Sequence, residues 1–517
     1  MERLIKQLSL NRGKVAFMQN NISKNYQNIG VEILNIKYLY DSIPLKNKNT
    51  AILYNENQKA EASIKAIAMM LMGINFTMVP TSQIKDKVWR LRDVLLKTRT
   101  TIVIGPKNYI ISDTLVSTWI NVNTLEIMHS NFELYNVLNI RKEREIVENY
   151  DNEFLKLYEM SESPFEESKI TVLNPGINQP EKETVFNYSA ILEGLKKTLE
   201  MPIYKGKDTV SVVPYNIDKP FVFVTSILVP LMLGGKVVFS APNAYDVIKE
   251  CKIHNANFLF IDTFNFNSIL NILIGKSTMW DKLKLWWKMK FTLPSLKQVI
   301  LYGEINQKTK KLLNKTPILK TASYCMIENT CIIASKTVKK LKKEITLTPK
   351  VDLKMSNLNG ESEILILDKT VLHSYAKGNK FVHSKNEFNT SDIGLLKKGE
   401  LHVIGSSESV ILDLSTHIVL RKEIIDDYLS KYKFIAENVI VKTNNSLLLL
   451  ADLDIEYCIE NNISYQKAVS KLPGILKGVN KKLNRIFGVF EIEKIIIAPK
   501  GIERINGKTR IWKYSVM

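Results

Sequence analysis

Five short segments of the chain carry side chains that could bind a phosphorylated substrate. The first, at positions 173–192, reads LNPGINQPEKETVFNYSAIL and combines a Gly/Pro/Asn loop with a lysine and a helix-like stretch. Backbone N–H groups in such a loop, and the N-terminus of a following helix, favour bound negative charge. Taken alone, a plain surface turn is the simpler interpretation of this segment.

Two further segments follow apolar runs typical of strands. In LYGE, Gly303 and Glu304 come directly after such a run, and in SYCMIENT, Tyr324 and Glu328 lie four residues apart after another. Ligands of open α/β sheets gather at the carboxyl ends of strands. An aromatic ring can cover a purine, and a carboxylate can hold Mg²⁺ beside phosphates. Each pair also fits a structural interpretation, as a turn glycine with an exposed acid or a core tyrosine with a surface glutamate.

The last two segments lie in the C-terminal part of the chain. Asp392, in FNTSDIGLLKKGELHVIG at 388–405, could bind vicinal hydroxyls, as acids bind ribose. The tail IERINGKTRIWKY at 502–514 carries Gly507 and Lys508, and a lysine ammonium is a compact charge suited to phosphate. The structural alternatives are an ordinary loop aspartate and a solvated basic tail.

The elements around these segments alternate between strands and helices. Strands are expected at 50–55, 74–80, 101–106, 209–214, 236–240, 257–261 and 296–301, and helices at 60–72, 85–96, 221–233 and 244–254. This alternation predicts βαβ units and parallel sheets.

After position 346 the pattern changes to short strands and turns. ESEILIL, NKFVHS and GELHVIG predict a small β-subdomain over about 346–404, and the mixed helix and strand signals from 405 to 517 predict a separate terminal domain. The predicted class is therefore α/β. A large domain, 1–404, holds two mixed, mainly parallel, helix-flanked sheets and the β-barrel-like subdomain. A small, mobile α+β domain, 405–517, follows it.

Composition excludes several classes of protein. The 517 residues are 45% hydrophobic and 24% charged, which excludes a disordered or fibrous chain. The spacing of the four cysteines fits neither a zinc site nor a disulfide framework, so we expect a reducing, cytoplasmic setting. The first residues lack the pattern of a secretory signal. The apolar stretch 221–239 is interrupted by Pro230, two glycines and a lysine, which predicts a buried helix and strand rather than a membrane span.

The net charge of +20 has two interpretations. It could attract an anionic partner or surface, or it could reflect lysines spread over solvated faces. Lysines cluster at 308–311 and 339–343, without the interleaved aromatics that a stacking surface needs. We therefore expect no nucleic-acid partner.

Taken together, the order and separation of the five segments resemble the adenylate-forming superfamily of acyl-CoA synthetases, peptide-synthetase adenylation domains and luciferases. The resemblance runs from about Ala51 to the C-terminus and includes a Pro- and Gly-containing apolar stretch at 214–238. In that family the phosphate loop reads roughly TSGTTGxPKG. Gly176 and Lys182 match it, whereas asparagine, proline and isoleucine replace its hydroxyl residues at 174, 175, 177 and 178.

The resemblance also implies roles for the other segments. Tyr324 would lie against adenine, Glu328 would hold Mg²⁺, Asp392 would bind the ribose, and Lys508, after Gly507, would contact the substrate carboxylate and the α-phosphate. Ser391 stands in place of the glycine in the family's T-G-D motif.

Around the predicted hinge the match is weaker. Glu408 occupies the hinge position, and Ser406 replaces the arginine of the family's G-R-x-D/K motif, after Gly405. The arginine would be a ribose contact.

The implied activity is that of a ligase that adenylates a carboxylic acid with ATP and Mg²⁺. Transfer of the acyl group to the thiol of CoA, or to the phosphopantetheine of an acyl carrier protein, would be a second step. The alternative is a catalytically impaired or inactive relative that binds a ligand or a protein, because the phosphate-loop motif is degraded. We expect an acyl pocket near 261–269, 302–304 and 323–326, and the phenylalanines of NFLFIDTFNFNSIL suit an apolar acid.

Overall fold

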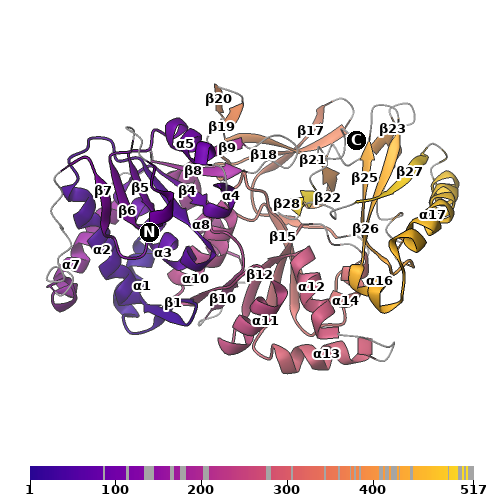
Figure 1. Ribbon diagram of the computed structural model, residues 1–517, viewed down its shortest axis with the longest axis horizontal. Coiled ribbons are helices and arrows are strands. Elements are labelled where there is room, and N and C mark those ends of the chain that lie inside the picture. The colour runs from indigo at the N-terminus through magenta and orange to yellow at the C-terminus, as the bar shows by residue number, and fades with distance from the viewer. Residues whose placement is uncertain are drawn as a thin grey trace.

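The computed structural model shows two lobes of unequal size, the larger formed by most of the chain (Figure 1). It describes residues 1–84, 88–111, 116–132, 145–162, 168–174, 182–201, 209–274, 281–303, 305, 307–342, 345–358, 361–372, 374–377, 380–383, 386–406, 411–413, 418–420, 425, 428–429, 431–442, 446–486, 488, 490–498, 504–505 and 508–509. The strands and helices expected between 50–106 and 209–301 are all present, with small shifts at their ends. The predicted α/β class is confirmed.

The first large sheet is parallel in its centre and antiparallel at its edges. Its strands are, in spatial order, β20 (Lys380–His383), β19 (Ser374–Lys377), β9 (Lys182–Asn187), β8 (Lys169–Asn174), β4 (Phe76–Pro80), β3 (Thr50–Tyr54), β5 (Ile102–Gly105), β6 (Thr118–Asn121) and β7 (Ile127–Ser130). Its associated helices are α2 (Tyr26–Ser42), α3 (Lys59–Met72), α4 (Thr81–Ile84), α5 (Val88–Lys97), α7 (Tyr150–Glu162) and α8 (Tyr188–Leu199). β3 is buried at every position, as expected for a central parallel strand.

The second large sheet has the same plan. Its strands are, in spatial order, β16 (Thr348–Pro349), β15 (Ala334–Val338), β14 (Leu319–Tyr324), β13 (Gln298–Tyr302), β12 (Phe258–Asp262), β10 (Val210–Val213), β11 (Lys236–Phe239), β1 (Val15–Gln19) and β2 (Ile22–Asn25). Helices α11 (Ala244–Ile253), α12 (Thr263–Ile274), α13 (Asp281–Thr292) and α14 (Gln307–Leu313) connect its parallel strands. β1, which follows α1 (Glu2–Leu10), pairs in parallel with β11, so the first strand of the chain lies in the sheet that is completed much later.

The apolar stretch at 221–239 is a buried helix followed by a buried strand, as predicted. The helix consists of α9 (Pro220–Val222), a π-helical turn (Phe223–Leu228) and α10 (Val229–Met232), and β11 comes next. No helix in the described part of the chain is both long and apolar enough to cross a bilayer.

The β-subdomain is an antiparallel sheet with the order β17 (Leu353–Leu358), β18 (Glu361–Leu367), β21 (Glu387–Lys397) and β22 (Glu400–Ser406). One predicted member does not belong to it. KFVH, the described part of NKFVHS, forms β20, whose partner β19 pairs with β9 of the first large sheet through Ser374 and Val185. β19 and β20 therefore extend the large sheet, because β9 pairs with β8 on one side and with β19 on the other.

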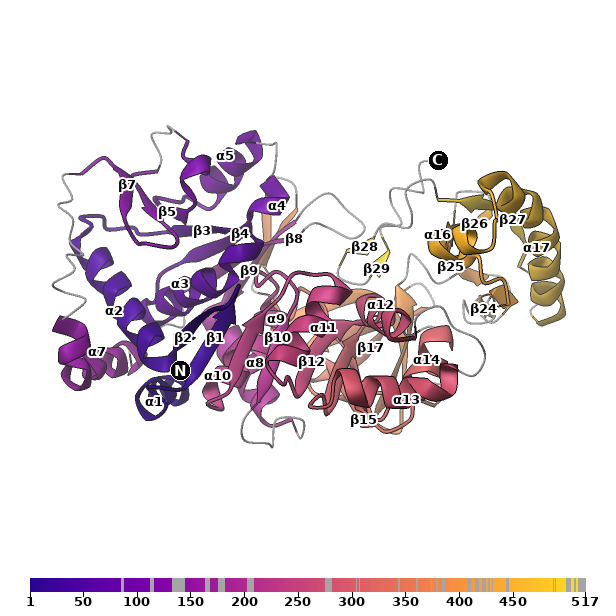
Figure 2. The ribbon, with the colours of Figure 1, turned by 60° about the horizontal axis from the view of Figure 1, so that its bottom comes forward.

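The terminal lobe, which Figure 2 shows beside the large one, has a hydrophobic core of its own. Its sheet is β25 (Ile435–Lys442), β26 (Leu447–Leu453) and β27 (Ile492–Ile497), with α16 (Ile455–Glu460) and α17 (Tyr465–Ile486) beside it. α17 buries Ala468, Leu472, Ile475, Val479 and Leu483, a three- and four-residue spacing that makes one apolar helix face. Two short hairpins, β23 (Ile411–Asp413) with β24 (Ile418–Leu420) and β28 (Arg504–Ile505) with β29 (Lys508–Thr509), complete the described elements of this region.

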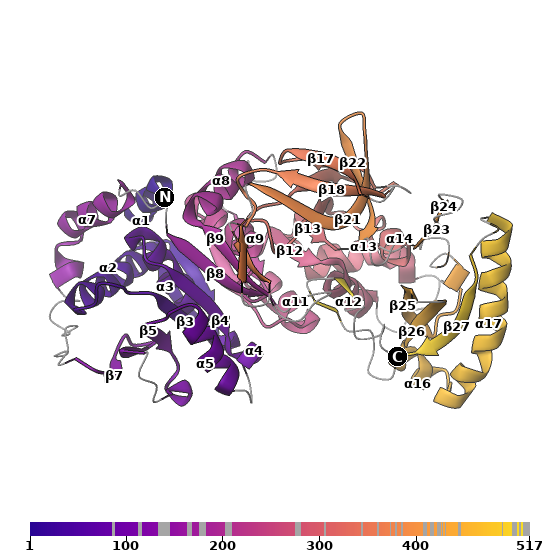
Figure 3. The same cartoon turned by 90° about the horizontal axis from the view of Figure 1, so that it is seen from above.

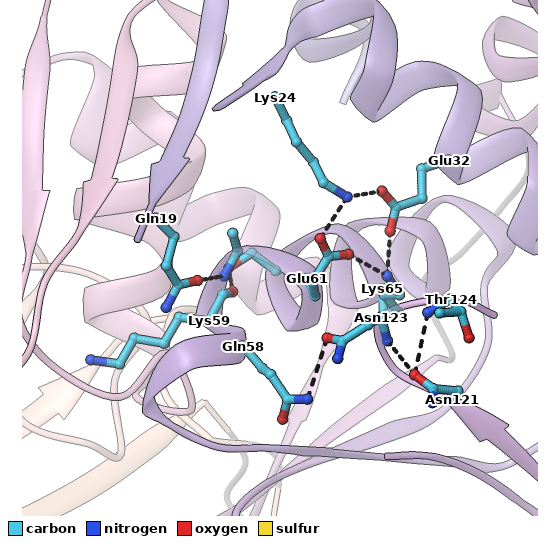
Figure 4. Close-up of polar contacts among 12 residues, drawn as sticks. Gln19, Lys24, Glu32, Gln58, Lys59, Glu61, Lys65, Asn121, Asn123 and Thr124 are labelled. Carbon is cyan, nitrogen blue, oxygen red and sulfur yellow. Dashed lines mark hydrogen bonds and ion pairs between the residues drawn. The ribbon is translucent and has the colours of Figure 1, made fainter. Parts of the chain in front are cut away.

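A network of four charged side chains joins β2, α2 and α3 (Figure 4). Lys24 pairs with Glu32 at 2.5 Å and with Glu61 at 2.6 Å, and the buried Lys65 pairs with the same two glutamates. Burial alone would raise the pKa of Glu32, but the ammonium groups of Lys65 and Lys24 outweigh it and lower that pKa to about 2. Each charge in the network thus faces two charges of opposite sign, which offsets the cost of burying it.

Candidate active site

The carboxyl ends of the parallel strands in the second sheet carry a row of polar side chains. Asp262 ends β12 and lies opposite Tyr302, the last residue of β13, which in turn lies opposite Ser323 of β14. All three side chains are buried. Substrates of open α/β sheets are expected at this edge, so its side chains are the candidates for binding and chemistry.

Tyr324 and Asp392, both predicted as site residues, meet at this edge. Tyr324 is the last residue of β14, and its hydroxyl donates a 2.5 Å hydrogen bond to Oδ2 of Asp392 in β21. Both side chains are buried. Burial, followed by the charge and hydrogen bond of Asp392, raises the pKa of Tyr324 well above its usual value. The phenol therefore remains protonated, and it can donate to the carboxylate.

The backbone around Asp392 fixes the direction of its carboxylate. The N–H of Asp392 donates to Oγ1 of Thr390 (3.0 Å), whose hydroxyl donates to the carbonyl of Ile364 in β18 (2.8 Å). Between them, Ser391 has a φ of +54°. That left-handed conformation favours glycine, the residue that the family motif carries at this position. The backbone turn is thus kept here although the glycine is not.

Glu328 lies close to this pair. Its side chain is half-buried, and its backbone carbonyl accepts a hydrogen bond from the N–H of Leu372 (2.9 Å). The charge of Glu328 is one of the causes, after burial and Asp392, that raise the pKa of Tyr324. Three residues that the sequence separates by up to 68 positions therefore share one site.

A second polar group lies next to it, around Asp262. The hydroxyl of Tyr215 donates to Oδ2 of Asp262, and the backbone N–H of Asp262 donates to the same hydroxyl oxygen at 2.9 Å. Asn265, in the first turn of α12, donates from its backbone to Oδ1 (2.8 Å) and from its side chain to Oδ2 (2.7 Å). The carboxylate is thus held by two residues, Tyr215 and Asn265, which lie on different segments of the chain.

Aromatic rings cover the region where we expected the acyl pocket. Tyr302 stacks on Phe260 with ring centroids 5.0 Å apart, and it meets Phe221 and Tyr215 edge-on at 5.5 and 5.9 Å. All four rings are buried. They give this edge of the sheet an apolar wall beside the polar groups.

The two large sheets meet at a third polar group, around Asp218. Tyr54, at the end of β3, accepts from the N–H of Asp218 (3.2 Å), and Gln83 of α4 donates to its carboxylate (3.1 Å). Burial raises the pKa of Asp218 to about 6, although the neighbouring charge of Lys219 opposes the shift. Burial likewise lowers the pKa of Lys219.

Lys59 strengthens the same junction from the first turn of α3. Its fully buried ammonium donates to the carbonyl oxygens of Pro214 (3.2 Å) and Ser240 (3.0 Å), which follow β10 and β11, and it pairs with Glu56 at 2.5 Å. The carboxyl ends of strands from both sheets therefore face one another across this group. The sequence contained a signal for both carboxylates, since YNIDK with Asp218 follows one apolar run and Asp262 ends another, FLFID, but neither residue was predicted.

Several predicted site residues lie outside the described residues. These are Gly176, Glu304, Glu408 and Gly507. Gly303 is described: it follows β13 with a φ of +85°, a conformation that favours glycine.

Only the backbone is described for the two predicted phosphate-binding lysines. Lys182 opens β9 opposite Asn174 of β8, and these two strands form an antiparallel pair. Lys508 opens β29 opposite Ile505 of β28. Figures 1, 2 and 3 all place the β28–β29 hairpin between the two lobes, beside the large lobe and apart from the sheet of β25, β26 and β27.

Comparison with known proteins identifies the fold. No family model and no curated protein sequence matches the chain. Among solved structures, it is similar to O-succinylbenzoate coenzyme A synthetase (MenE) from Bacillus subtilis, in complex with ATP and magnesium ion, with a TM-score of 0.70 and 12% identity over 100% of this chain and 99% of that one. It is also similar to the anthranilate CoA ligase AuaEII in complex with anthranoyl-AMP (TM-score 0.74, 11% identity, 99% and 96% covered).

A third similar structure is ATP-bound MatB from Rhodopseudomonas palustris, with a TM-score of 0.71 and 12% identity over 100% of this chain and 98% of that one. The match covers both lobes in all three comparisons. The chain therefore has the fold of the adenylate-forming superfamily, and the resemblance seen in its sequence is confirmed for the fold.

Proposed function

We propose that this protein is a ligase that adenylates a carboxylic acid with ATP. The observation that carries the proposal is the hydrogen bond between Tyr324 and Asp392 at the carboxyl edge of the second sheet, with Glu328 near enough for its charge to act on Tyr324. Two solved structures of this fold are named as a coenzyme A synthetase and a CoA ligase, and the similar structures include complexes with ATP and with anthranoyl-AMP.

The reaction joins a weak nucleophile to a highly anionic substrate. The carboxylate attacks the α-phosphorus in line, the bond to the bridging oxygen breaks, and pyrophosphate leaves with the electron pair. The protein must align the two reactants and offset negative charge. We assign the alignment of the nucleotide to Tyr324, against the adenine, and to Asp392, which would accept from the ribose hydroxyls. Lys508 would contact the attacking carboxylate and the α-phosphate.

Binding of the ribose would change the set of groups that donate hydrogen bonds to the carboxylate of Asp392. Its carboxylate already accepts from the hydroxyl of Tyr324, and a carboxylate has about four acceptor positions. The ribose would therefore add to the bond from Tyr324 or replace it.

Glu328 fits a magnesium site that relies on the substrate. Mg²⁺ in nucleotide sites is commonly held by one or two carboxylates, with phosphate oxygens and water completing the octahedron. Across the residues that the structure describes, no three acidic, histidine or cysteine side chains cluster as a metal site would require. One carboxylate from Glu328 together with the ATP phosphates is thus the arrangement these residues support. The ion would offset charge on the phosphates.

On the phosphate side, we assign Lys182 and the backbone near Gly176 to the leaving pyrophosphate. Gly303 and Glu304 would add contacts at the end of β13. Because the positions at 174, 175, 177 and 178 lack hydroxyl groups, we expect the β- and γ-phosphates to be held less firmly than a hydroxyl-rich loop would hold them.

The acid substrate would lie against the aromatic wall. Solved structures of similar fold are named for O-succinylbenzoate and anthranilate. The stacked Tyr302 and Phe260 rings favour an acid with an apolar or aromatic body.

We further propose that acyl transfer to a thiol follows adenylation. In that step the small domain, 405–517, would turn about Glu408 relative to 1–404, and the acceptor would be CoA or the phosphopantetheine of a carrier protein. The separate core of the terminal lobe supports the division. A cytoplasmic location is part of the proposal, supported by four cysteines that are free and buried.

A second candidate is a relative that binds its ligand without turnover. Two departures from the family motifs favour this candidate: the phosphate loop lacks its hydroxyl residues, and Ser406 stands in place of the arginine. Each lost electrostatic donor costs about 10²–10³ in rate.

ATP–pyrophosphate exchange with a panel of aliphatic, aromatic and amino acids separates the two candidates. Adenylation predicts exchange with at least one acid, a loss of about 10²–10³ in rate for Lys508→Ala, and full activity for Lys494→Ala, an exposed lysine of β27. A thermal shift with ATP but no exchange for any acid would support the non-catalytic candidate. The absence of both exchange and an ATP-dependent shift would exclude adenylation and leave only a non-catalytic relative whose ligand is not ATP.

A further inference from the structure

Helix α13 carries a ridge of exposed aromatic side chains, which we call the α13 ridge. It consists of Trp286, Trp287 and Phe291, which are 37%, 55% and 74% exposed. The opposite face of the helix is buried through Leu285 and Met289. Large exposed aromatics on adjacent turns of one helix are uncommon on a surface that contacts only water.

The three rings form one continuous surface. Trp286 and Trp287 meet edge-on with centroids 4.8 Å apart, and Trp287 stacks on Phe291 at 6.0 Å. The ammonium of Lys290 lies 5.0 Å from the centre of the Trp286 ring. A cation therefore stands directly beside the apolar surface.

The surrounding sequence concentrates positive charge. Positions 281–343 hold fifteen lysines and three acids, a net charge of +12 out of the chain's +20. The exposed lysines among them include Lys290, Lys297, Lys311, Lys315, Lys339, Lys340 and Lys342. The charge of the protein is thus concentrated on one region.

Several of these lysines lie together at the amino ends of β13 and β14, which we call the basic edge, as two hydrogen bonds show. Lys297 precedes β13, and its carbonyl accepts from the N–H of Leu319, the first residue of β14 (3.0 Å). The buried Lys320 donates to the carbonyl of Lys339, at the end of β15 (2.8 Å). Burial, and to a smaller extent the charge of Lys340, lowers the pKa of Lys320 to about 8.

The α13 ridge adjoins this basic edge. Phe291 lies in the last turn of α13, and the chain reaches Lys297 only six residues later. Figure 1 and Figure 2 show α13 on the outer face of the large lobe with α14 next to it. Tyr302 and Tyr324, by contrast, end the same strands at the opposite edge.

We infer that the α13 ridge and the basic edge bind the surface of an anionic lipid membrane. Tryptophan and phenylalanine would enter the interface between headgroups and acyl chains, and the lysines would face the anionic headgroups. The candidate active site, at the other end of the strands, would stay open to the solution. The protein would thus be held at a bilayer without spanning it.

The shape of the surface favours a membrane over single-stranded nucleic acid. Proteins that bind single strands use a charged groove in which bases stack on separate aromatic rings. Here Trp286 and Trp287 cover each other on a helix at the outer face of the lobe. The net positive charge of the region also disfavours pairing with the same region of a second copy.

Co-sedimentation of the full-length chain with vesicles tests the inference. We expect binding to vesicles of equal parts phosphatidylcholine and phosphatidylglycerol, weak binding to phosphatidylcholine alone, and a steep loss with added salt. Combining Trp287→Ala with Phe291→Ala should lower the partition coefficient by about tenfold or more. The matched control is Trp89→Ala, a 67% exposed tryptophan on α5, which should change nothing.

A second variant tests the charge alone. Replacing Lys297, Lys315 and Lys340 by glutamine should weaken binding by about fivefold for each lysine. Three results would overturn the inference: no binding to the anionic vesicles at low salt, equal binding by the α13 double variant, or displacement from the vesicles by a single-stranded oligonucleotide that binds through the same aromatics. Concentration-dependent self-association that the double variant abolishes would instead assign the ridge to contact between copies.

Discussion

The hydroxyl of Tyr324 donates to the carboxylate of Asp392 across 68 positions of sequence, and both side chains are buried. This bond joins the end of a parallel strand in the second sheet to the β-subdomain. In the proposed function both residues bind the nucleotide, and of the two arrangements given above we expect the ribose to replace the bond between them.

Replacing Tyr324 with phenylalanine should separate stability from nucleotide binding. The variant leaves the buried carboxylate of Asp392 with one donor fewer, so we expect a loss of about 1–3 kcal/mol in the free energy of unfolding. The ring remains for the adenine and the carboxylate is released for the ribose. The KM for ATP should therefore fall, by about threefold.

Denaturant unfolding and exchange kinetics measure the two effects. The control is Tyr26→Phe, which removes a buried hydroxyl bonded to the carbonyl groups of Leu231 and Gly235, far from the site. It should lose stability with an unchanged KM. A higher KM for ATP in Tyr324→Phe would contradict the competition between the two contacts.

Asp218 should make the protein more stable as the pH falls from about 6 to about 4. Its pKa in the folded protein, about 6, lies above the usual 3.8, so the folded state binds more protons than the unfolded state between these values. The free energy of unfolding should therefore increase by on the order of 2 kcal/mol as the pH falls from 6 to 4, and this gain is lost again as the pH rises through 6. Asp218→Asn should remove this slope in a series of unfolding curves between pH 4 and 7. The exposed Asp93→Asn, on α5, should keep it.

Substitution of Lys65 should lower the free energy of unfolding more than substitution of most other charged residues in the chain. Lys65→Met leaves the half-buried Glu32 and Glu61 with Lys24 as their remaining cation, and breaking such a network costs about 3–5 kcal/mol. Lys6→Met, which breaks an exposed pair with Glu2, should change the free energy of unfolding by less than about 1 kcal/mol. Thermal unfolding of the two variants compares them directly, and similar losses would show that the buried network adds little.

The same network predicts a loss of stability in acid. The pKa of Glu32 in the folded protein, about 2, is below its usual 4.5, so its contribution is complete above 4.5 and is lost as the pH falls toward 2. This trend opposes that of Asp218. Glu32→Gln should weaken the fall in stability between pH 4 and 2, measured by far-UV circular dichroism, and an unchanged acid transition would refute the assignment.

Gly194 connects a helix to the turn that holds Glu328. A Cβ at Gly194 of α8 would stand 2.4 Å from Oγ1 and 3.1 Å from the backbone oxygen of Thr330. Gly194→Ala should therefore displace this turn and cost about 1–3 kcal/mol. Because Thr330 is two residues from Glu328, the Mg²⁺ concentration needed for exchange should rise. Gly474→Ala, at a site with open space in α17, should affect neither measurement.

The local elements were predictable because burial sets their sequence pattern. Parallel strands buried on both faces read as apolar runs, and β3, β4, β5, β10, β11, β12 and β13 were all found in this way. The partners of a strand are decided by contacts far away in sequence. β1 was therefore missed, and β20 was assigned to the wrong sheet.

The same distinction applies to the candidate site. Tyr324, Glu328 and Asp392 were predicted from motifs, and they lie together. Asp218 and Asp262 were missed, because their importance comes from burial between elements rather than from a motif. Their positions, Asp262 at the last residue of β12 and Asp218 shortly after β10, are the signal that the sequence carried for them.

The pairing of β1 with β11 has a consequence for synthesis on the ribosome. Val237, the partner of Phe17, is translated about 220 residues after it, which takes on the order of 10–45 s at about 5–20 residues per second. Throughout that interval the nascent β1–β2 hairpin exposes the edge of β1, because β11 has not yet been synthesised. A chaperone that shields this edge during translation would improve the yield of folded protein more than one added after release.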